Sequence, residues 1–172
     1  MKHADHSLNF EPKQGNPAVY LRRRRLALNA VILGACAGLT AVAFRLLLEK
    51  AEHLREAFLG LFTSPYFILP SILLATLITA TVLIVTRFAP ESSGSGIPHL
   101  KGVLHEGFQF RDVRVLLIKF WGGIVAIGSG LALGREGPTV QMGGATGSIL
   151  SRWFGSNADE RELLICSGAG AG

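Results

Sequence analysis

The sequence predicts an all-α membrane protein, a partial bundle in which tilted spanning helices surround short, broken helices that enter the membrane without crossing it. Hydrophobic residues make up 49% of the 172 residues and charged residues only 17%, a balance typical of membrane proteins. Apolar runs at 26–44, 67–86 and 115–134 are close to the roughly 20 residues that a spanning helix needs. Shorter apolar segments that begin with glycine and proline lie between and after them, and broken helices are tolerated at membrane depth only around a protein-lined cavity.

The N-terminal part combines a polar tail with a basic cluster and the first apolar run. Residues 1–25 are interpreted as a cytoplasmic tail and residues 26–172 as a membrane domain. The arginines at 22–25 place the N-terminus inside, because cytoplasmic flanks of spanning helices are rich in lysine and arginine. They abut an apolar run without interleaved aromatic residues, so we expect no nucleic-acid partner. A cleaved signal is the alternative for 26–44, but the run exceeds the about 7–15 apolar residues of such signals.

The next elements alternate between the two sides of the membrane. The first run continues as a charged helix through 45–56 and is broken at 63–65. The second run returns to the inside, and the third crosses outward with Lys119 near its inner end. This lysine can snorkel to the interface or lie buried. The third run is expected to end at 134.

Small residues predict where helices approach one another closely. Glycine lets two backbones come into contact, and a spacing of four places both glycines on one helix face. A short helix is expected at 138–150, and the spacing of Asn157 and Glu160 is typical of a capping box that opens a last helix. The glycines in question are Gly34 and Gly38 in the first run, Gly122, Gly123, Gly128 and Gly130 in the third, and Gly143 and Gly147 in the short helix.

Two charged residues, Arg135 and Glu136, stand between the third run and the short helix. A charge near the bilayer centre costs about 2.5–3.5 kcal/mol, so an ionisable residue at that depth indicates function. The flanking Gly134, Gly137 and Pro138 are typical of a helix start. Its free N–H groups carry about half a positive charge and attract anions. The stretch predicts an anion-facing helix start with one carboxylate beside it; the simpler interpretation is that Glu136 only pairs with Arg135.

A second stretch, GSGIP at 94–98, has the same design and adds the hydroxyl of Ser95. By topology it enters from the inner side and the stretch at 134–138 from the outer side, so the two helix starts can converge near the midplane. Amide groups and a hydroxyl suit a weakly hydrated anion such as chloride, because partial charges still permit release. Protonation of Glu136 would remove a carboxylate that competes for the same positive helix end.

Together, GSGIP at 94–98 and GREGPTVQ at 134–141 resemble the CLC family of chloride channels and proton-coupled chloride transporters. The resemblance covers roughly residues 26–172. It implies transmembrane transport of chloride, by a voltage-gated channel or an H+/Cl− antiporter, and the motifs do not separate the two. It also implies a homodimer in a lipid bilayer, and we expect a multi-pass protein of the bacterial inner membrane. Chloride and protons would be its partners, with no cofactor.

The resemblance also implies a role for each matching residue. The amides of Gly94 and Ser95 would face an inner chloride site, and the Ser95 hydroxyl would bind the central chloride. The amides of Arg135, Glu136 and Gly137 would face an outer chloride site. Glu136 would in addition be the gate and the external proton acceptor.

The chain departs from the family pattern at two positions after GSGIP. His99 follows where an acidic residue is usual, and Lys101 stands where another acid can occur, so the electrostatics of the inner side are open. The chain also stops within a run of glycine and alanine, so we expect a fragment that lacks the second half of the family's pathway. Alone, it is not expected to carry chloride.

Two other classes of function compete with transport. A non-transporting membrane anchor or assembly subunit would need neither Ser95 nor Glu136. A membrane-embedded enzyme could use Arg135 and Glu136 as an acid–base pair, but no nucleophile, catalytic base or metal cluster accompanies them in the sequence. We therefore expect no enzyme and no metal site.

Overall fold

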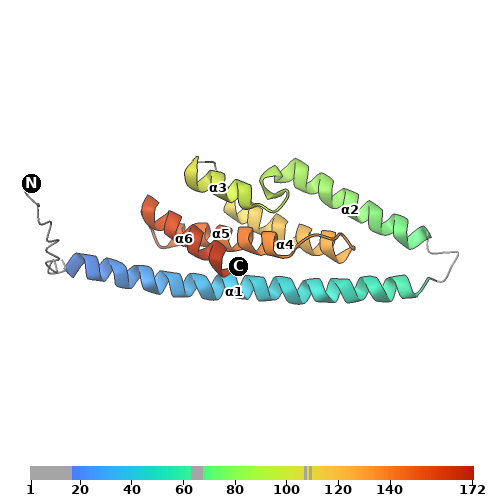
Figure 1. Ribbon diagram of the computed structural model, residues 1–172, viewed down its shortest axis with the longest axis horizontal. Helices are drawn as coiled ribbons and strands as arrows, with labels where there is room; N and C mark the ends of the chain where they lie inside the picture. Colours follow the sequence, from blue (N-terminus) through green and yellow to red (C-terminus); the bar gives the residue numbers. More distant parts are fainter. Residues whose placement is uncertain (1–16, 63–67, 107, 109) are drawn as a thin grey trace, which may run out of the picture.

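The computed structural model describes residues 17–62, 68–106, 108 and 110–172, and every regular element within these ranges is a helix (Figure 1). The side chains of residues 17–23 are not described. The elements are α1 (Pro17–Gly60), α2 (Ile68–Phe88), the short 3-10 helix η1 (Pro90–Ser92), α3 (Ile97–His105), α4 (Asp112–Gly128), α5 (Glu136–Trp153) and α6 (Ala158–Ala171).

Helix α1 runs along the whole length of the bundle, and the other helices lie on one side of it (Figure 1). It packs against α4, α5 and α6, while α2 packs against α4. Within the described residues, two helices are long and apolar enough to cross a membrane, namely the Arg24–Gly60 part of α1 and all of α2. The first two predicted runs therefore lie in the expected elements, and 45–56 continues α1 as expected. The predicted break at 63–65 lies outside the described residues.

The predicted end of the third run at 134 is wrong, because α4 ends at Gly128. Gly130 adopts a φ of +108°, which an α-helix does not permit, and the amide of Leu131 bonds instead to the carbonyl of Ala126 at 3.2 Å. An irregular segment, 129–135, then leads to α5. The short helix is longer than predicted at both ends, at Glu136–Trp153. The capping box of Asn157 and Glu160 is confirmed at the start of α6.

Glycines set the spacing between several helices. A Cβ on Gly123 would lie 3.0 Å from the ring of Phe44, and one on Gly128 would lie 2.7 Å from the Cβ of Ala51, so α4 needs both glycines to pack on α1. Between α5 and α6 the approach is closer, since a Cβ on Gly143 would lie 2.1 Å from the carbonyl oxygen of Gly168. Gly34 and Gly38 differ: a Cβ at either would meet nothing within 4 Å among the described atoms.

The core joins α1, α4 and α5. Phe44 and Leu48 from α1 pack with Ile124 and Ile127 from α4 and with Met142 from α5, and all five are nearly inaccessible to solvent. Burial of large side chains contributes about 1.5–3 kcal/mol each. This core fixes the position of α5 relative to the end of α4, and with it the segment that carries Arg135 and Glu136.

Candidate functional site

The loop before α3 is shaped by glycines in a left-handed conformation. Gly94 has a φ of +64° and Gly96, the N-cap of α3, a φ of +75°. Such dihedrals cost residues with a Cβ roughly 1–2 kcal/mol. Pro98 lies in the first turn, where its lack of an N–H loses no hydrogen bond. The first helical bond runs from the Leu100 amide to the Gly96 carbonyl at 3.0 Å, so earlier amides of this turn remain free for a ligand.

Helix α5 begins in a similar way at the other stretch. Arg135 is its N-cap, Glu136 is its first residue and Pro138 lies in the first turn. The amide of Thr139 bonds to the carbonyl of Arg135 at 3.4 Å, and no side chain caps the first turn. The start of α5 is therefore a second place where amide donors are available to an anion.

The two helix starts meet, as the sequence predicts. A Cβ on Gly137 would lie 2.9 Å from the Cα of Ser95 and 3.0 Å from its carbonyl oxygen, so only glycine permits this approach. Both stretches line one cavity of about 660 Å³, which α2 and α4 complete. Gly94, Ser95, Glu136 and Gly137 are among the lining residues.

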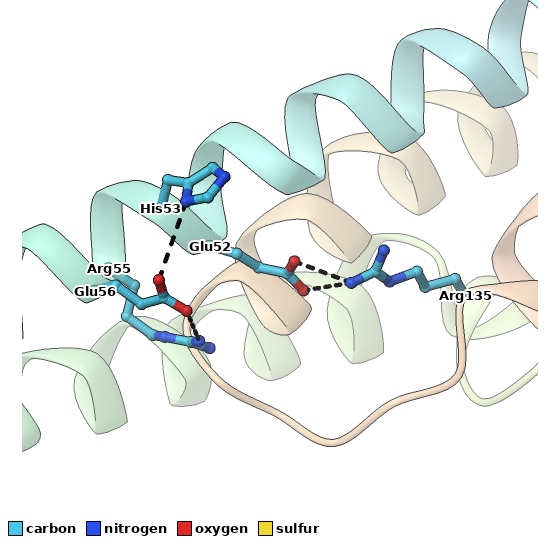
Figure 2. A network of polar contacts seen from close by, with 5 residues as sticks. All are labelled: Glu52, His53, Arg55, Glu56 and Arg135. Carbon is cyan, nitrogen blue, oxygen red and sulfur yellow. Dashed lines mark hydrogen bonds and ion pairs between the residues drawn. The ribbon is translucent and has the colours of Figure 1, made fainter.

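Arg135 and Glu136, neighbours at the start of α5, have different surroundings. Glu136 lines the cavity, and its carboxylate has no hydrogen bond or ion pair with any residue that the structure describes. Arg135 does not line the cavity; its Nη2 lies 2.8 and 2.9 Å from the two carboxylate oxygens of Glu52 in α1 (Figure 2). The simple pairing of Glu136 with Arg135 is therefore not what the structure shows.

Lys119 is buried beside the cavity, with 7% of its surface exposed. Its Nζ donates hydrogen bonds to the carbonyl oxygens of Ser92 at 2.9 Å and of Gly94 at 2.6 Å. Of the two possibilities open from the sequence, snorkelling is excluded and burial is observed. By holding these carbonyls toward α4, Lys119 fixes the loop whose next amides open α3.

The family model described as the voltage gated chloride channel matches residues 76–172. The chain belongs to this family. Among curated relatives, the H+/Cl− exchange transporter ClcA of Vibrio campbellii is 41% identical over 149 residues, which are 83% of this chain and 31% of that protein. ClcA of Citrobacter koseri is 41% identical over 152 residues, or 86% of this chain and 32% of that one.

A solved structure, described as that of a slow cyanobacterial Cl−/H+ antiporter, matches with a TM-score of 0.79 and 31% identity. The match covers 86% of this chain and 35% of that one. The chain spans about a third of the length of the curated relatives it matches. The helical CLC-type fold is thereby confirmed. The named relatives are transporters and not enzymes, and CLC proteins are integral membrane proteins.

The two departures from the CLC pattern have different surroundings. The His99 ring is half-buried with its centre 5.7 Å from that of Phe110, whereas Lys101 is exposed. α3 is too short to span a membrane. Burial lowers the pKa of His99, and the Glu91 carboxylate partly opposes this shift. Because an unperturbed histidine titrates near 6.5, His99 is mainly neutral at pH 7. It therefore supplies neither the negative charge of the acidic residue that is usual at this position nor a full positive charge.

Two residues that contact these loops and helix starts have no role in the sequence-based interpretation. Gln141 ends the GREGPTVQ motif; it is fully buried, donates to the carbonyl of Glu91 at 2.9 Å and fills the space beside Gly96. Its place at the end of the GREGPTVQ motif was the one feature of the sequence that could have pointed to Gln141. Glu52 lies in the charged part of α1, and nothing in the sequence pairs it with Arg135. In the described part of the chain, no cluster of three or more His, Cys, Asp or Glu could hold a metal ion.

Proposed function

We propose that this chain forms part of a proton-coupled chloride pathway, in which the starts of α3 and α5 bind the anion and Glu136 is the gate. The observation that carries the proposal is one cavity lined by both helix starts and by Glu136, whose carboxylate has no partner among the described residues. Free amides at helix starts attract anions. Relatives named as H+/Cl− exchange transporters favour an exchanger over a channel.

Each predicted site residue has a place in this proposal. Gly94 and Ser95 offer amides from the loop before α3, and Ser95 adds a hydroxyl. Arg135, Glu136 and Gly137 offer amides from the start of α5. All except Arg135 line the cavity, so Arg135 would contribute through its backbone only. The contact of Gly137 with Ser95 keeps the two sets of donors close together.

Glu136 competes with the anion for the same helix end. Its ionised carboxylate is favoured at an N-terminus, where it takes the place of the anion. A proton from the outer side neutralises it, the carboxyl group leaves, and chloride enters. Once the proton has passed to the inner side, the ionised carboxylate returns to the helix end and displaces the chloride outward, so that the two fluxes are coupled in opposite directions.

The arrangement in the membrane belongs to the same proposal. Residues 1–25 form a cytoplasmic tail, and residues 26–172 are part of the CLC membrane domain in a bacterial inner membrane. Only 11% of the most apolar 18-residue stretch of α2 is buried. The rest of this stretch is available to lipid or to other CLC helices. A homodimer is expected for the full-length protein.

The proposal is tested by measuring chloride and proton flux together in liposomes that contain the full-length protein, over a range of external pH. We expect wild-type flux to rise as the external pH falls. Glu136→Gln mimics the protonated gate, so chloride flux should persist while its pH dependence and the coupled proton movement are lost.

Glu162→Gln is the matched control, because Glu162 is an exposed carboxylate in α6 that does not line the cavity. It should retain the wild-type profile and the proton coupling. If Glu136→Gln also retains both, Glu136 is not the gate, and the proposed mechanism is wrong.

A further inference from the structure

Glu52 and Arg135 form an ion pair although they are 83 positions apart in the chain. Arg135 is the residue immediately before Glu136, the proposed gate. The Nη2 of Arg135 lies within 2.9 Å of both carboxylate oxygens of Glu52 (Figure 2). The side chain of Glu52 is 26% exposed and that of Arg135 50% exposed. The pair is thus a partly buried contact between α1 and the N-cap of α5.

No other side chain in the 129–135 segment has a hydrogen bond or ion pair to a described residue outside it. Its other bonds are backbone turns, such as Gly130 to Ile127 at 2.9 Å. Arg55, one turn after Glu52, lies beside Gly130, where a Cβ would be 3.3 Å from its Nη1. The outer part of α1 therefore touches both ends of the segment that leads to Glu136.

Among the described residues, Glu52 is the carboxylate that pairs with Arg135, and the neighbouring charged groups have other partners. In α1, Glu56 is shared by His53 at 4.0 Å and Arg55 at 3.8 Å (Figure 2). Among the described residues that line the cavity, only Lys119 from α4 and Glu136 have ionisable side chains, and those of α2 and of the loop before α3 have none. Arg135, the neighbour of Glu136 in the chain, is thus paired with Glu52, and Lys119, which lines the same cavity, is bonded to carbonyls.

We propose that Glu52 is a positioning residue that holds the guanidinium of Arg135 against α1, and so keeps it from pairing with Glu136. Arg135 and Glu136 are adjacent in the chain, and a flexible arginine released from Glu52 can reach its neighbour. A cation beside a carboxylate favours the ionised form. Glu52 thereby sets the external pH at which Glu136 takes up a proton, which rests on the proposed function of Glu136 as the gate.

The test is the external pH at half-maximal chloride flux, measured with the full-length protein in liposomes. In Glu52→Gln, which keeps the shape of the side chain but removes its charge, this midpoint should move about half a pH unit lower, the size that one partly exposed charge pair allows. Glu52→Asp retains the charge and should stay closer to the wild type. Glu56→Gln, which removes a carboxylate one turn along the same helix, should leave the midpoint unchanged.

A second background separates an effect through Arg135 from direct repulsion between Glu52 and Glu136. When Arg135 is replaced by Gln, Glu52→Gln should shift the midpoint by less than half of the shift seen with Arg135 present. No shift with Arg135 present, a shift to higher pH, or an equal shift in both backgrounds would overturn the proposal.

The outcome for Glu136→Gln distinguishes this inference from the proposed function. If that variant loses its pH dependence while Glu52→Gln keeps the wild-type midpoint, Glu136 is the gate but Glu52 does not position Arg135. If Glu136→Gln keeps the wild-type pH dependence, the proposed gate itself is wrong.

Discussion

At the residue scale, the start of α5 separates two charges that are neighbours in the sequence. Arg135 pairs with Glu52 in α1, and Glu136 is among the residues that line the cavity. Residues at i and i+1 do not share a helix face, and a partner on another helix reinforces that difference. The result is a carboxylate with no hydrogen bond or ion pair to the described residues, as the proposed gate requires.

Ser95 carries a hydroxyl in the loop before α3, lines the cavity and has its backbone against Gly137 at the start of α5. Ser95→Ala removes that donor and leaves the amide. A hydrogen bond is worth about 0.5–1.5 kcal/mol, so we expect the ratio of chloride to nitrate flux to change by roughly 2- to 10-fold. Flux from liposomes loaded with each anion in turn measures the ratio.

Ser93→Ala is the control for this prediction, because Ser93 lines the same cavity two residues earlier but precedes the predicted anion donors. Its ratio should equal that of the wild type. An unchanged ratio in Ser95→Ala would mean that Ser95 only shapes the turn between Gly94 and Gly96.

At the scale of elements, glycines allow the backbones of α5 and α6 to come into contact. A Cβ on Gly168 would lie 2.2 Å from the carbonyl oxygen of Gly143. A Cβ on Gly147 would lie 2.3 Å from the carbonyl oxygen of Leu164. Because α5 also carries Glu136 at its first position, this backbone contact helps to fix the direction in which the helix start points.

Gly168→Ala is therefore expected to destabilise the full-length protein, since forcing extra atoms into a packed contact costs about 1–3 kcal/mol. Gly170→Ala is a control in the same helix, because a Cβ there meets no described atom within 4 Å. It should be neutral, or stabilising by up to about 1 kcal/mol through helix propensity. The measurement is the thermal unfolding midpoint of the Gly168→Ala and Gly170→Ala variants in detergent. Equal midpoints for the two variants would show that the α5–α6 contact adapts at little cost in free energy.

At the scale of the whole molecule, the cavity depends on segments distant in sequence. Residues from α2, the loop before α3, α4 and the start of α5 surround it, and the core of Phe44, Ile124 and Met142 holds α1, α4 and α5 together behind it. The curated relatives named as exchange transporters are about three times as long as the matched region. The remainder of such a protein is expected to complete the pathway.

The 172-residue chain alone is therefore predicted to carry no selective chloride flux. The measurement is chloride efflux from liposomes that contain only this chain, compared with protein-free liposomes and with the full-length protein at equal mass. Efflux above the protein-free level that also responds to Glu136→Gln would contradict the prediction and would mean that these helices suffice.

Much of the fold and the outline of the site are determined by the sequence alone. Apolar length indicated the first two spans, because the length of a spanning helix is set by the membrane. Glycine with proline indicated a helix start at the GSGIP stretch and one at 138, two residues after α5 begins, because these preferences are local properties of the backbone. The spacing of the two motifs was sufficient to indicate the CLC family. The end of α4 at Gly128 was missed because Leu131 and Leu133 continue the apolar pattern after the helix has turned.

The tertiary structure alone decided the partners of the polar side chains. Lys119 could face the interface or the interior, and only the position of the loop at Ser92 and Gly94 made burial favourable, since its carbonyls satisfy the ammonium group. Glu52 meets Arg135 because α1 passes the start of α5, and Gly34 and Gly38 have the spacing of a contact that the described residues do not make. Local pattern determines which backbone conformation is favoured, whereas pairing depends on distances across the bundle, which no local pattern contains.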